Sequence, residues 1–205
     1  MAKQIINVGT SANDGTGDPN RTAFQKCNSN FDELYNSIPT TEQYKFLLSQ
    51  SGGDDPQTAT SGTLTQGVTY EIVTFETGDD FTPSGAPNND VGTKWIANGV
   101  APSWGNGSEI GWNNGAPIII DSIGTNQIGN FWFEWIATGA FYCKSDGLFA
   151  VGKTYIDIGS NYTENGGLAT TRDLNINEFI IDSTLAGVGE NGVLNNTSFE
   201  IIVNN

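Results

Sequence analysis

Short turn dipeptides punctuate the second half of the chain, and they constrain its fold more than any other feature. Five Asn-Gly pairs begin at residues 98, 106, 114, 165 and 191, and Asp146-Gly147 adds a sixth dipeptide of this kind. Asn, Asp and Gly tolerate the positive φ angles of two-residue hairpins, so these pairs predict tight turns between antiparallel strands. Long helices are not expected in a region interrupted so often.

The segments between the turns have the character of strands from about residue 60 onward. Several alternate apolar and polar residues, which is the pattern of a strand with one buried face. The expected strands are Thr69–Phe75, Thr93–Ala97, Ser108–Trp112, Pro117–Asp121, Asn130–Thr138, Ala140–Lys144, Lys153–Ile158, Glu178–Asp182 and Ser198–Val203. The fold class that follows is mainly β, with an antiparallel sandwich-like or barrel-like body.

The N-terminal region contains the clearest helix signal. Asp18 is a suitable N-cap, Pro19 suits the first helical position, and Ile38 is pushed out of the helical conformation by the proline after it, so a helix is expected from about Pro19 to Ser37. Its apolar residues recur at alternating spacings of three and four: Phe24, Cys27, Phe31, Leu34 and Ile38. This stripe predicts either an oligomer seam or a helix that packs on its own domain, and the sequence leaves both open.

Charge and glycine divide the chain into two differently built regions. Residues 1–50 hold four basic and five acidic groups, whereas residues 51–205 hold four basic and 18 acidic groups. The expected organisation is an N-terminal attachment arm and helix (1–38), a short helix through Thr41–Leu48 followed by a linker (39–60), a small β module (61–113) and a C-terminal β-domain (114–205).

Composition also excludes several classes of function. A formal net charge of −15 argues against binding nucleic acid, and the absence of histidine removes the usual general base and the commonest zinc ligand. We find no phosphate-binding loop and expect no cofactor.

The N-terminus lacks a signal-peptide pattern and no apolar run could span a membrane, so we expect a soluble protein made in the cytoplasm without membrane insertion. Cys27 and Cys143 are expected to be reduced, small and buried.

Acidic residues provide the candidates for chemistry. The segment from Asn13 to Asp18 has oxygen ligands as a calcium loop does, but it lacks the distal glutamate, so a structured turn is expected. The pairs Asp54-Asp55 and Asp79-Asp80 are expected to be solvated loop carboxylates. Glu134 lies between aromatic residues, where desolvation could raise its pKa, as the general acid of a glycoside hydrolase requires. A partly exposed glutamate between apolar neighbours is, however, also ordinary in an edge or interface strand. We therefore expect no enzymatic activity.

All five tryptophans lie between residues 95 and 135. Exposed indoles can stack on sugar rings, so Trp95, Trp104 and Trp112 are the candidate carbohydrate-binding face. Two other interpretations remain open, since aromatic residues are also common in the cores of β-domains and in subunit interfaces.

The N-terminal segment carries the most specific pattern in the chain. It reads Ile5-Ile6-Asn7-Val8-Gly9, Asn13-Asp14-Gly15-Thr16-Gly17-Asp18-Pro19, Arg21-Thr22-Ala23-Phe24, Lys26, Asn28, Asn30-Phe31 and Glu33-Leu34-Tyr35. In this order and spacing it resembles, over residues 4 to about 36, the N-terminal module of tailed-bacteriophage virion proteins, including baseplate-wedge and tail-fibre proteins. Asn20 and Cys27 depart from that module, which usually has an apolar residue and an isoleucine there.

Later segments have similarities of the same kind. Residues 78–109 are similar to a small β module of phage structural proteins, and residues 129–134 and 196–203 to their C-terminal β-domains. The resemblance implies a virion protein, such as a tail, baseplate, fibre or head-appendage component, that is usually a homotrimer bound to other virion proteins. It also implies attachment through the arm, for which the candidate residues are Ile5, Ile6, Val8, Asp14, Asp18 and Arg21. The alternative expectation is a receptor protein that binds a host-surface carbohydrate.

Overall fold

Two separate units make up the part of the chain that the structure describes. The structure is a computed structural model, and it describes residues 4–11, 14–37, 41–159 and 167–204. The first unit lies within residues 1–40 and the second spans residues 41–204. We call the first the N-terminal unit and the second the β body.

The N-terminal unit consists of an extended arm and one helix. Helix α1 spans Asn20–Ser37, within one residue of the helix that the sequence predicts. The amide of Ala23 donates to the carbonyl of Pro19 at 3.0 Å, so helical hydrogen bonding begins at that proline. Proline suits this place because its fixed φ is compatible with a helix and its nitrogen needs no partner.

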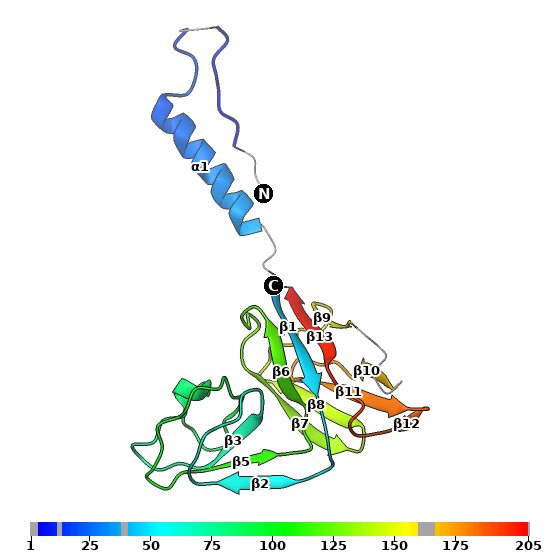
Figure 1. The fold of residues 1–205 in the computed structure, drawn as a ribbon. Coiled ribbons are helices and arrows are strands. Elements are labelled where there is room, and N and C mark those ends of the chain that lie inside the picture. Colours follow the sequence, from blue (N-terminus) through cyan, green and yellow to red (C-terminus); the bar gives the residue numbers. More distant parts are fainter. Residues whose placement is uncertain (1–3, 12–13, 38–40, 160–166, 205) are drawn as a thin grey trace. The chain divides into compact units, whose positions relative to one another are not determined.

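The β body is built from three antiparallel sheets, shown in Figure 1. Its strands are β1 (Thr41–Ser49), β2 (Pro56–Ala59), β3 (Thr69–Thr74), β4 (Lys94–Ile96), β5 (Glu109–Asn113), β6 (Ile118–Ile123), β7 (Phe131–Ala137), β8 (Ala140–Ser145), β9 (Thr154–Ile158), β10 (Leu168–Arg172), β11 (Glu178–Leu185), β12 (Val188–Gly189) and β13 (Thr197–Asn204). A short 3-10 helix, η1, spans Thr82–Ser84. The strand orders are β6-β1-β13-β9, β10-β11-β8-β7 with β12 beside β11, and β2-β5-β3-β4. The predicted fold class, mainly β with a sandwich-like body, is confirmed.

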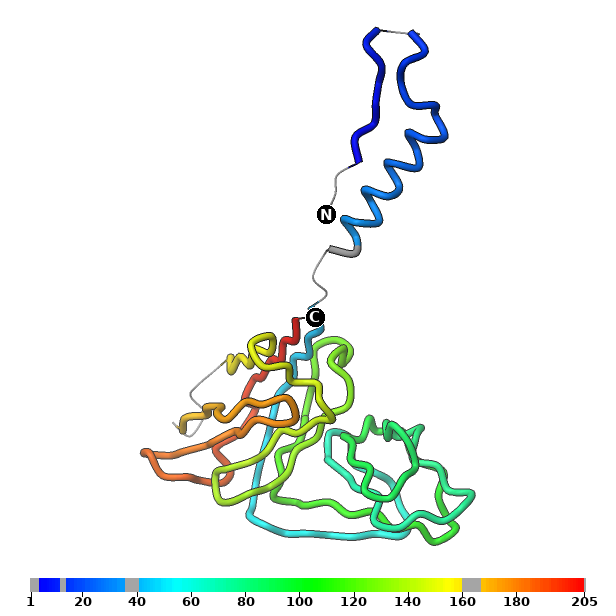
Figure 2. The backbone as a smooth tube through the Cα atoms, turned by 180° about the vertical axis from the view of Figure 1, so that it is seen from behind, coloured from blue at the N-terminus to red at the C-terminus, as the bar shows by residue number. Residues whose placement is uncertain are grey.

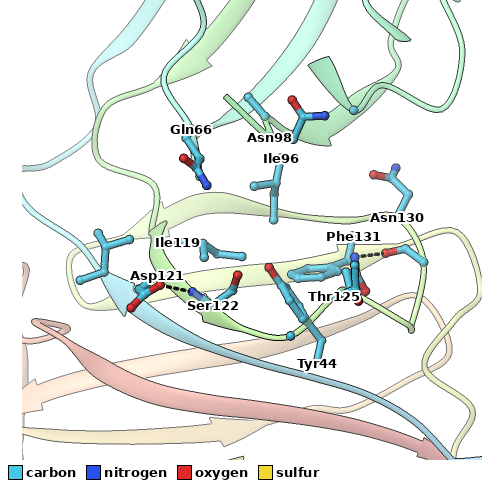
Figure 3. Close-up of a pocket in the computed structure, with 17 residues that line it drawn as sticks. Tyr44, Gln66, Ile96, Asn98, Ile119, Asp121, Ser122, Thr125, Asn130 and Phe131 are labelled. Atoms are coloured by element: carbon cyan, nitrogen blue, oxygen red, sulfur yellow. Dashed lines mark hydrogen bonds between the residues drawn. The ribbon is translucent and has the colours of Figure 1, made fainter. Parts of the chain in front are cut away.

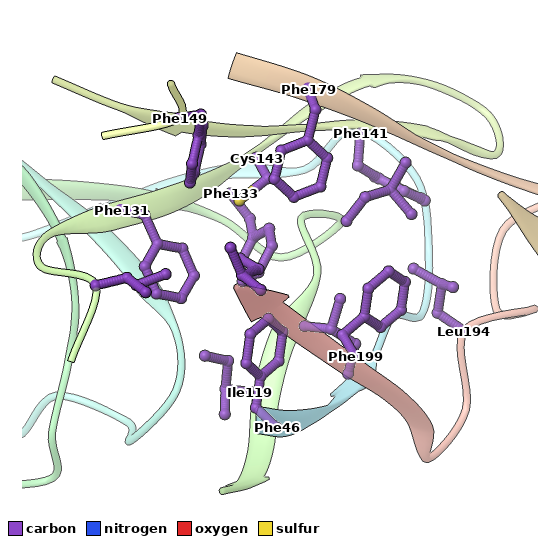
Figure 4. Packing of buried hydrophobic residues seen from close by; sticks show 14 of the residues in the cluster. Phe46, Ile119, Phe131, Phe133, Phe141, Cys143, Phe149, Phe179, Leu194 and Phe199 are labelled. Carbon is purple, nitrogen blue, oxygen red and sulfur yellow. The ribbon is translucent and has the colours of Figure 1, made fainter. Parts of the chain in front are cut away.

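The first two sheets form a sandwich around an aromatic core. Phe46 of β1 lies 6.1 Å, centroid to centroid, from Phe199 of β13 and 6.2 Å from Phe133 of β7, so it contacts side chains of both sheets. Figure 4 shows these rings between the sheets. Seven of the eleven phenylalanines belong to this core: Phe46, Phe131, Phe133, Phe141, Phe149, Phe179 and Phe199. Burial of so many large side chains is the main source of stability for such a sandwich.

The third sheet forms a small module inserted into the sandwich. Strands β2 to β5 follow β1 and precede β6, although β1 and β6 are antiparallel neighbours in one sheet. Figures 1 and 2 both show the module beside the sandwich. It has its own core around Ile72, Phe81, Trp95 and Ile110.

The short helix predicted through Thr41–Leu48 is wrong, because this segment is strand β1. Tyr44, Phe46 and Leu48 alternate with Lys45 and Leu47. Phe46 and Leu48 are fully buried in the sandwich core, whereas Lys45 and Leu47 are less buried. The partner strand β13 lies about 150 residues further along the chain, with Phe46 opposite Phe199. As a result the sandwich contains residues 41–49 as well as 114–204, and part of the predicted linker is strand β2.

The predicted role of the Asn-Gly pairs also needs correction. Two-residue hairpin loops occur at Thr138-Gly139 and Ala186-Gly187 instead, and the latter has positive φ at both residues. Asn98-Gly99, Asn106-Gly107 and Asn191-Gly192 lie in longer loops. The pair at 165–166 lies outside the described residues.

Two smaller expectations have different outcomes. Cys143 is a buried free thiol whose pKa is raised well above its ordinary value by burial, whereas Cys27 is only half-buried. Asp79 is not a solvated loop carboxylate: its side chain is buried and accepts hydrogen bonds from the amides of Gly105, Asn106 and Ser108 at 2.8 to 3.2 Å.

Within the described ranges, no helical segment has the length and hydropathy of a membrane span.

Candidate functional sites

Polar contacts hold the N-terminal arm against helix α1. The amide of Gln4 donates to Oδ1 of Asn30 at 2.9 Å, and Nδ2 of Asn30 donates back to the carbonyl of Gln4 at 3.0 Å. Nζ of Lys26 donates to the carbonyl of Ile5 at 3.1 Å and to Oδ2 of Asp18 at 2.6 Å. Lys26 and Asn30 are four residues apart and therefore share one face of the helix, which is the face that the arm covers.

Asp18 closes the base of the arm rather than capping the helix as predicted. Its Oδ2 accepts from the amide of Asn7 at 2.9 Å, and its own amide donates to the carbonyl of Asn7 at 2.7 Å. The hydrogen bond from Lys26 and the one from Asn7 lower the pKa of Asp18 below its ordinary value.

Asp14 organises the tip of the arm. Its carboxylate accepts from the Thr10 hydroxyl and from the amides of Thr10, Ser11 and Thr16, at 2.7 to 2.9 Å. These hydrogen bonds, that from the Thr10 side chain above all, hold the pKa of Asp14 far below its ordinary value. The segment is thus the structured turn that the sequence predicts.

Apolar side chains of this unit remain exposed. Phe24, Phe31 and Leu34 of the predicted seam are 68%, 58% and 53% exposed, Cys27 is half-buried, and Ile38 lies outside the described residues. Helical spacing places the three exposed residues on one stripe of α1. This stripe borders the face of Lys26 and Asn30, because Leu34 follows Asn30 by four residues. Further residues of the unit are also exposed: Ile5, Val8, Arg21 and Tyr35. Ile6 is half-buried.

The three candidate tryptophans do not form the predicted face. Trp95 is 0% exposed and lies in the core of the module, so it cannot contact a ligand. Trp104 and Trp112 are half-buried and line one hollow of about 430 Å³. Their indole N–H groups already donate to the carbonyl of Gly62 and to Oδ1 of Asn114. The hollow therefore offers indole surfaces and the rim hydroxyls of Ser61, Thr63 and Thr65.

Glu134 is ion-paired rather than poised as an acid. Its Oε1 lies 2.8 Å from Nζ of Lys94 and its Oε2 lies 2.8 Å from Nζ of Lys144, while Nε1 of Trp132 donates to Oε1 at 3.0 Å. Burial opposes ionisation, but these hydrogen bonds outweigh it and lower the pKa of Glu134 to about 2. The raised pKa considered from the sequence is therefore wrong.

A larger cleft lies where the module meets the sandwich, and Figure 3 shows its lining. It encloses about 580 Å³, which falls within the usual range for small-molecule sites. Its apolar lining residues are Tyr44, Ile96, Ile119, Ile120 and Phe131, and its polar ones are Gln66, Asn98, Asp121, Ser122, Thr125, Asn126 and Asn130. Neither lysine nor arginine occurs among the residues that line it.

Contacts between the module and the sandwich fix the walls of this cleft. The amide of Ile119 in β6 donates to the carbonyl of Gly67 at 3.0 Å, and Nδ2 of Asn130 donates to the carbonyl of Lys94 at 2.9 Å. Gly67 has a φ of 80°, and a Cβ there would lie 1.8 Å from the carbonyl oxygen of Ile119, so only glycine fits. Hydrogen bonds between the two parts therefore set the walls of the cleft before any ligand arrives.

A β-bulge shapes the floor of the cleft. Leu48 pairs with Ile119 while Leu47 pairs with Asp121, so Ile120 is an extra residue in β6. The bulge allows the consecutive residues from Ile119 to Ser122 all to line the cleft. Bulges often redirect side chains beside functional sites. Sequence reasoning missed this site because its residues come from separate segments and their types form no motif.

Comparisons with protein-family models, with curated proteins and with solved structures find no match to this chain.

Proposed function

We propose that this chain is a structural component of a tailed-phage virion, docked through its N-terminal unit and displaying its β body. The observation that carries the proposal is the exposed apolar surface of a unit too small to bury it. Phe24 and Phe31 on the helix and Ile5 and Val8 on the arm are between 58% and 87% exposed. Clusters of exposed apolar side chains mark surfaces that bind other proteins.

The arm and the helix serve different contacts in this proposal. The apolar side of α1, with Phe24, Phe31 and Leu34, meets the same helix in two other copies and forms a homotrimer. The arm, with Ile5 and Val8 exposed, lies against another virion protein together with Arg21 in the first turn of α1. The resemblance of residues 4 to about 36 to phage attachment modules supports the same division.

The β body acts by binding or display rather than by catalysis. A general acid for glycoside hydrolysis needs a raised pKa, whereas Glu134 has a pKa of about 2 and two lysine partners. Its residues 51–205 carry 18 acidic and four basic groups, which keeps such a body solvated and makes neighbouring copies repel.

Truncation tests the attachment role. A phage with a null allele of this gene is complemented with the protein lacking residues 1–38, with full-length protein, or with full-length Glu76→Gln as a surface control. We expect the truncated protein to remain a folded β body, with cooperative melting and β-type circular dichroism, yet to be absent from purified particles. Incorporation of the truncated protein at normal copy number would place attachment in the β body and refute the proposal.

Carbohydrate binding by the β body is the second candidate function. Two pockets favour it: the hollow of Trp104 and Trp112, and the cleft beside Tyr44. Both are accessible to a ligand, combine aromatic rings with hydroxyl or amide groups, and have no basic residue in their lining. Titration of the protein with host-surface polysaccharide, followed by tryptophan fluorescence and calorimetry, tests it. A saturable response supports the function, and no heat or spectral change up to millimolar sugar contradicts it.

A further inference from the structure

We propose that the cleft between the module and the sandwich binds a neutral saccharide, with Asp121 and Gln66 as the principal hydrogen-bonding groups. This inference rests on the second candidate function, carbohydrate binding, and assigns it a site and a ligand class. It is independent of how the N-terminal unit docks.

A carboxylate and an amide without full hydrogen bonding line the cleft. Within the described residues, the Gln66 amide and the hydroxyls of Ser122 and Thr125 have no hydrogen-bond partner, and Asp121 uses only Oδ1, which accepts from the amide of Ser122. In the hollow, both indole N–H groups and the Asn114 side chain are already paired, and the polar groups it offers are the hydroxyls of Ser61, Thr63 and Thr65. A carboxylate and an amide can each bond adjacent hydroxyls of one sugar ring, the amide as donor and as acceptor.

The apolar part of the cleft suits the other face of a sugar. Tyr44 is half-buried and lies 6.0 Å, centroid to centroid, from the buried ring of Phe131. Ile96 and Ile119 continue this apolar surface, as Figure 3 shows. A pyranose has one side rich in C–H groups that packs against such a surface while its hydroxyls reach the polar rim.

Charge excludes anionic saccharides from the ligand class. The cleft contains one carboxylate and no cationic residue, so a uronic acid, sialic acid or phosphate would meet repulsion without a counter-charge. The surrounding body is itself strongly acidic, which repels anions over distances comparable with the Debye length. The volume of about 580 Å³ accommodates a short segment of one to three sugar residues.

The cleft is also preorganised. The contacts from Ile119 to Gly67 and from Asn130 to Lys94 set the distance between its walls without a ligand. A further contact, from the buried amide of Phe133 to the Thr69 hydroxyl at 3.0 Å, joins the same two parts. A preformed site loses less conformational entropy when it binds.

Calorimetry with the full-length protein tests this inference. The probes are lactose, maltotriose, triacetylchitotriose and 3′-sialyllactose, the last being the anionic partner of lactose. The variants are Asp121→Ala and Gln66→Ala in the cleft, Trp112→Leu in the hollow, and Asp146→Ala as an exposed control. Both cleft residues are exposed, so their variants should melt as the wild type does.

We expect at least one neutral probe to bind, and each cleft variant to weaken it about tenfold or more through loss of one hydrogen-bonding group. Trp112→Leu and Asp146→Ala should bind as the wild type does, and 3′-sialyllactose should bind more weakly than lactose. Loss of binding in Trp112→Leu with unchanged cleft variants would overturn the cleft assignment and leave carbohydrate binding intact. Tighter binding of the sialylated sugar would overturn the neutral class. Failure of every neutral probe would overturn both this inference and the second candidate function.

Discussion

Nζ of Lys94 in the module lies 2.8 Å from Oε1 of Glu134 in the sandwich, and this ion pair joins the two parts of the β body. Glu134 is shared with Lys144 on β8, and Lys94 also lies 3.4 Å from Oε2 of Glu71. About a quarter of each charged side chain in the Lys94–Glu134 pair remains accessible to solvent. The network therefore lies at a half-buried boundary, where ion pairs contribute more than they do at a fully exposed surface.

Replacing Glu134 with glutamine should destabilise the β body. Lys94 and Lys144 would then face each other across a neutral amide, so the free energy of unfolding should fall by about 2 kcal/mol. Urea denaturation at neutral pH measures the change. The matched control is Glu76→Gln, because Glu76 is exposed. Equal stability of the two variants would mean that the network does not join the parts.

Acid should weaken the same network. The pKa of Glu134 is about 2 in the folded protein and 4.5 ordinarily, so the unfolded chain binds the proton more readily. Stability from this group is complete above about pH 4.5 and is lost as the pH falls toward 2. Asp79 behaves similarly: burial would raise its pKa, but hydrogen bonds from Ser108, Asn106 and Gly105 lower it from 3.8 to about 2. We expect Glu134→Gln to lose less stability than the wild type between pH 5 and pH 2, in parallel denaturation series; identical pH profiles would refute the assignment.

Assembly should depend on the apolar side of α1. Phe31→Asp would bury an unpaired charge in the proposed seam, so it should shift the trimer toward monomer, as measured by multi-angle light scattering. Gln25→Asp introduces the same charge outside the seam and should leave assembly intact. Since each copy carries a charge of −15, added salt should strengthen association. A wild-type monomer at high protein concentration and moderate salt would contradict the homotrimer.

The arm should loosen when the Asp18 carboxylate is neutralised. Asp18→Asn removes the ion pair with Lys26 and weakens acceptance of the Asn7 amide. Hydrogen exchange of the Asn7 amide should become several-fold faster, while amides in the middle of α1 keep their protection. Asp32→Asn is the control, on the exposed part of the helix. Unchanged exchange at Asn7 would show that other contacts hold the arm.

One substitution should stabilise the protein. Ala186 has a φ of 53° in the two-residue turn between β11 and β12, a conformation that costs an L-residue with a Cβ about 1 kcal/mol. Ala186→Gly should therefore raise the free energy of unfolding by about 0.5 to 1 kcal/mol, measured by thermal and urea denaturation. Ala101→Gly relieves no such strain and should have no stabilising effect. A lower melting temperature for Ala186→Gly would refute this expectation.

Local patterns in the sequence determined most of the elements. All nine predicted strands and the helix occur, because alternation of apolar residues is the period of a half-buried strand and their 3-4 spacing is the period of a helix. The same patterns failed at Thr41–Leu48. There Tyr44, Leu47 and Leu48 fit a helical spacing, while Tyr44, Phe46 and Leu48 fit an alternating one. Pairing with β13, far along the chain, decided that this segment is a strand.

Tertiary structure alone decided where the candidate sites lie. Trp95, Trp104 and Trp112 are alike in the sequence, yet packing buries the first completely and leaves the other two in one hollow. The cleft requires the module to be inserted between β1 and β6, and the ion pair that joins the module to the sandwich requires Lys94 to meet Glu134 across 40 residues of chain. A sequence specifies each strand through neighbouring residues, but a cleft depends on which distant strands pack together, and that is settled only when the whole core forms.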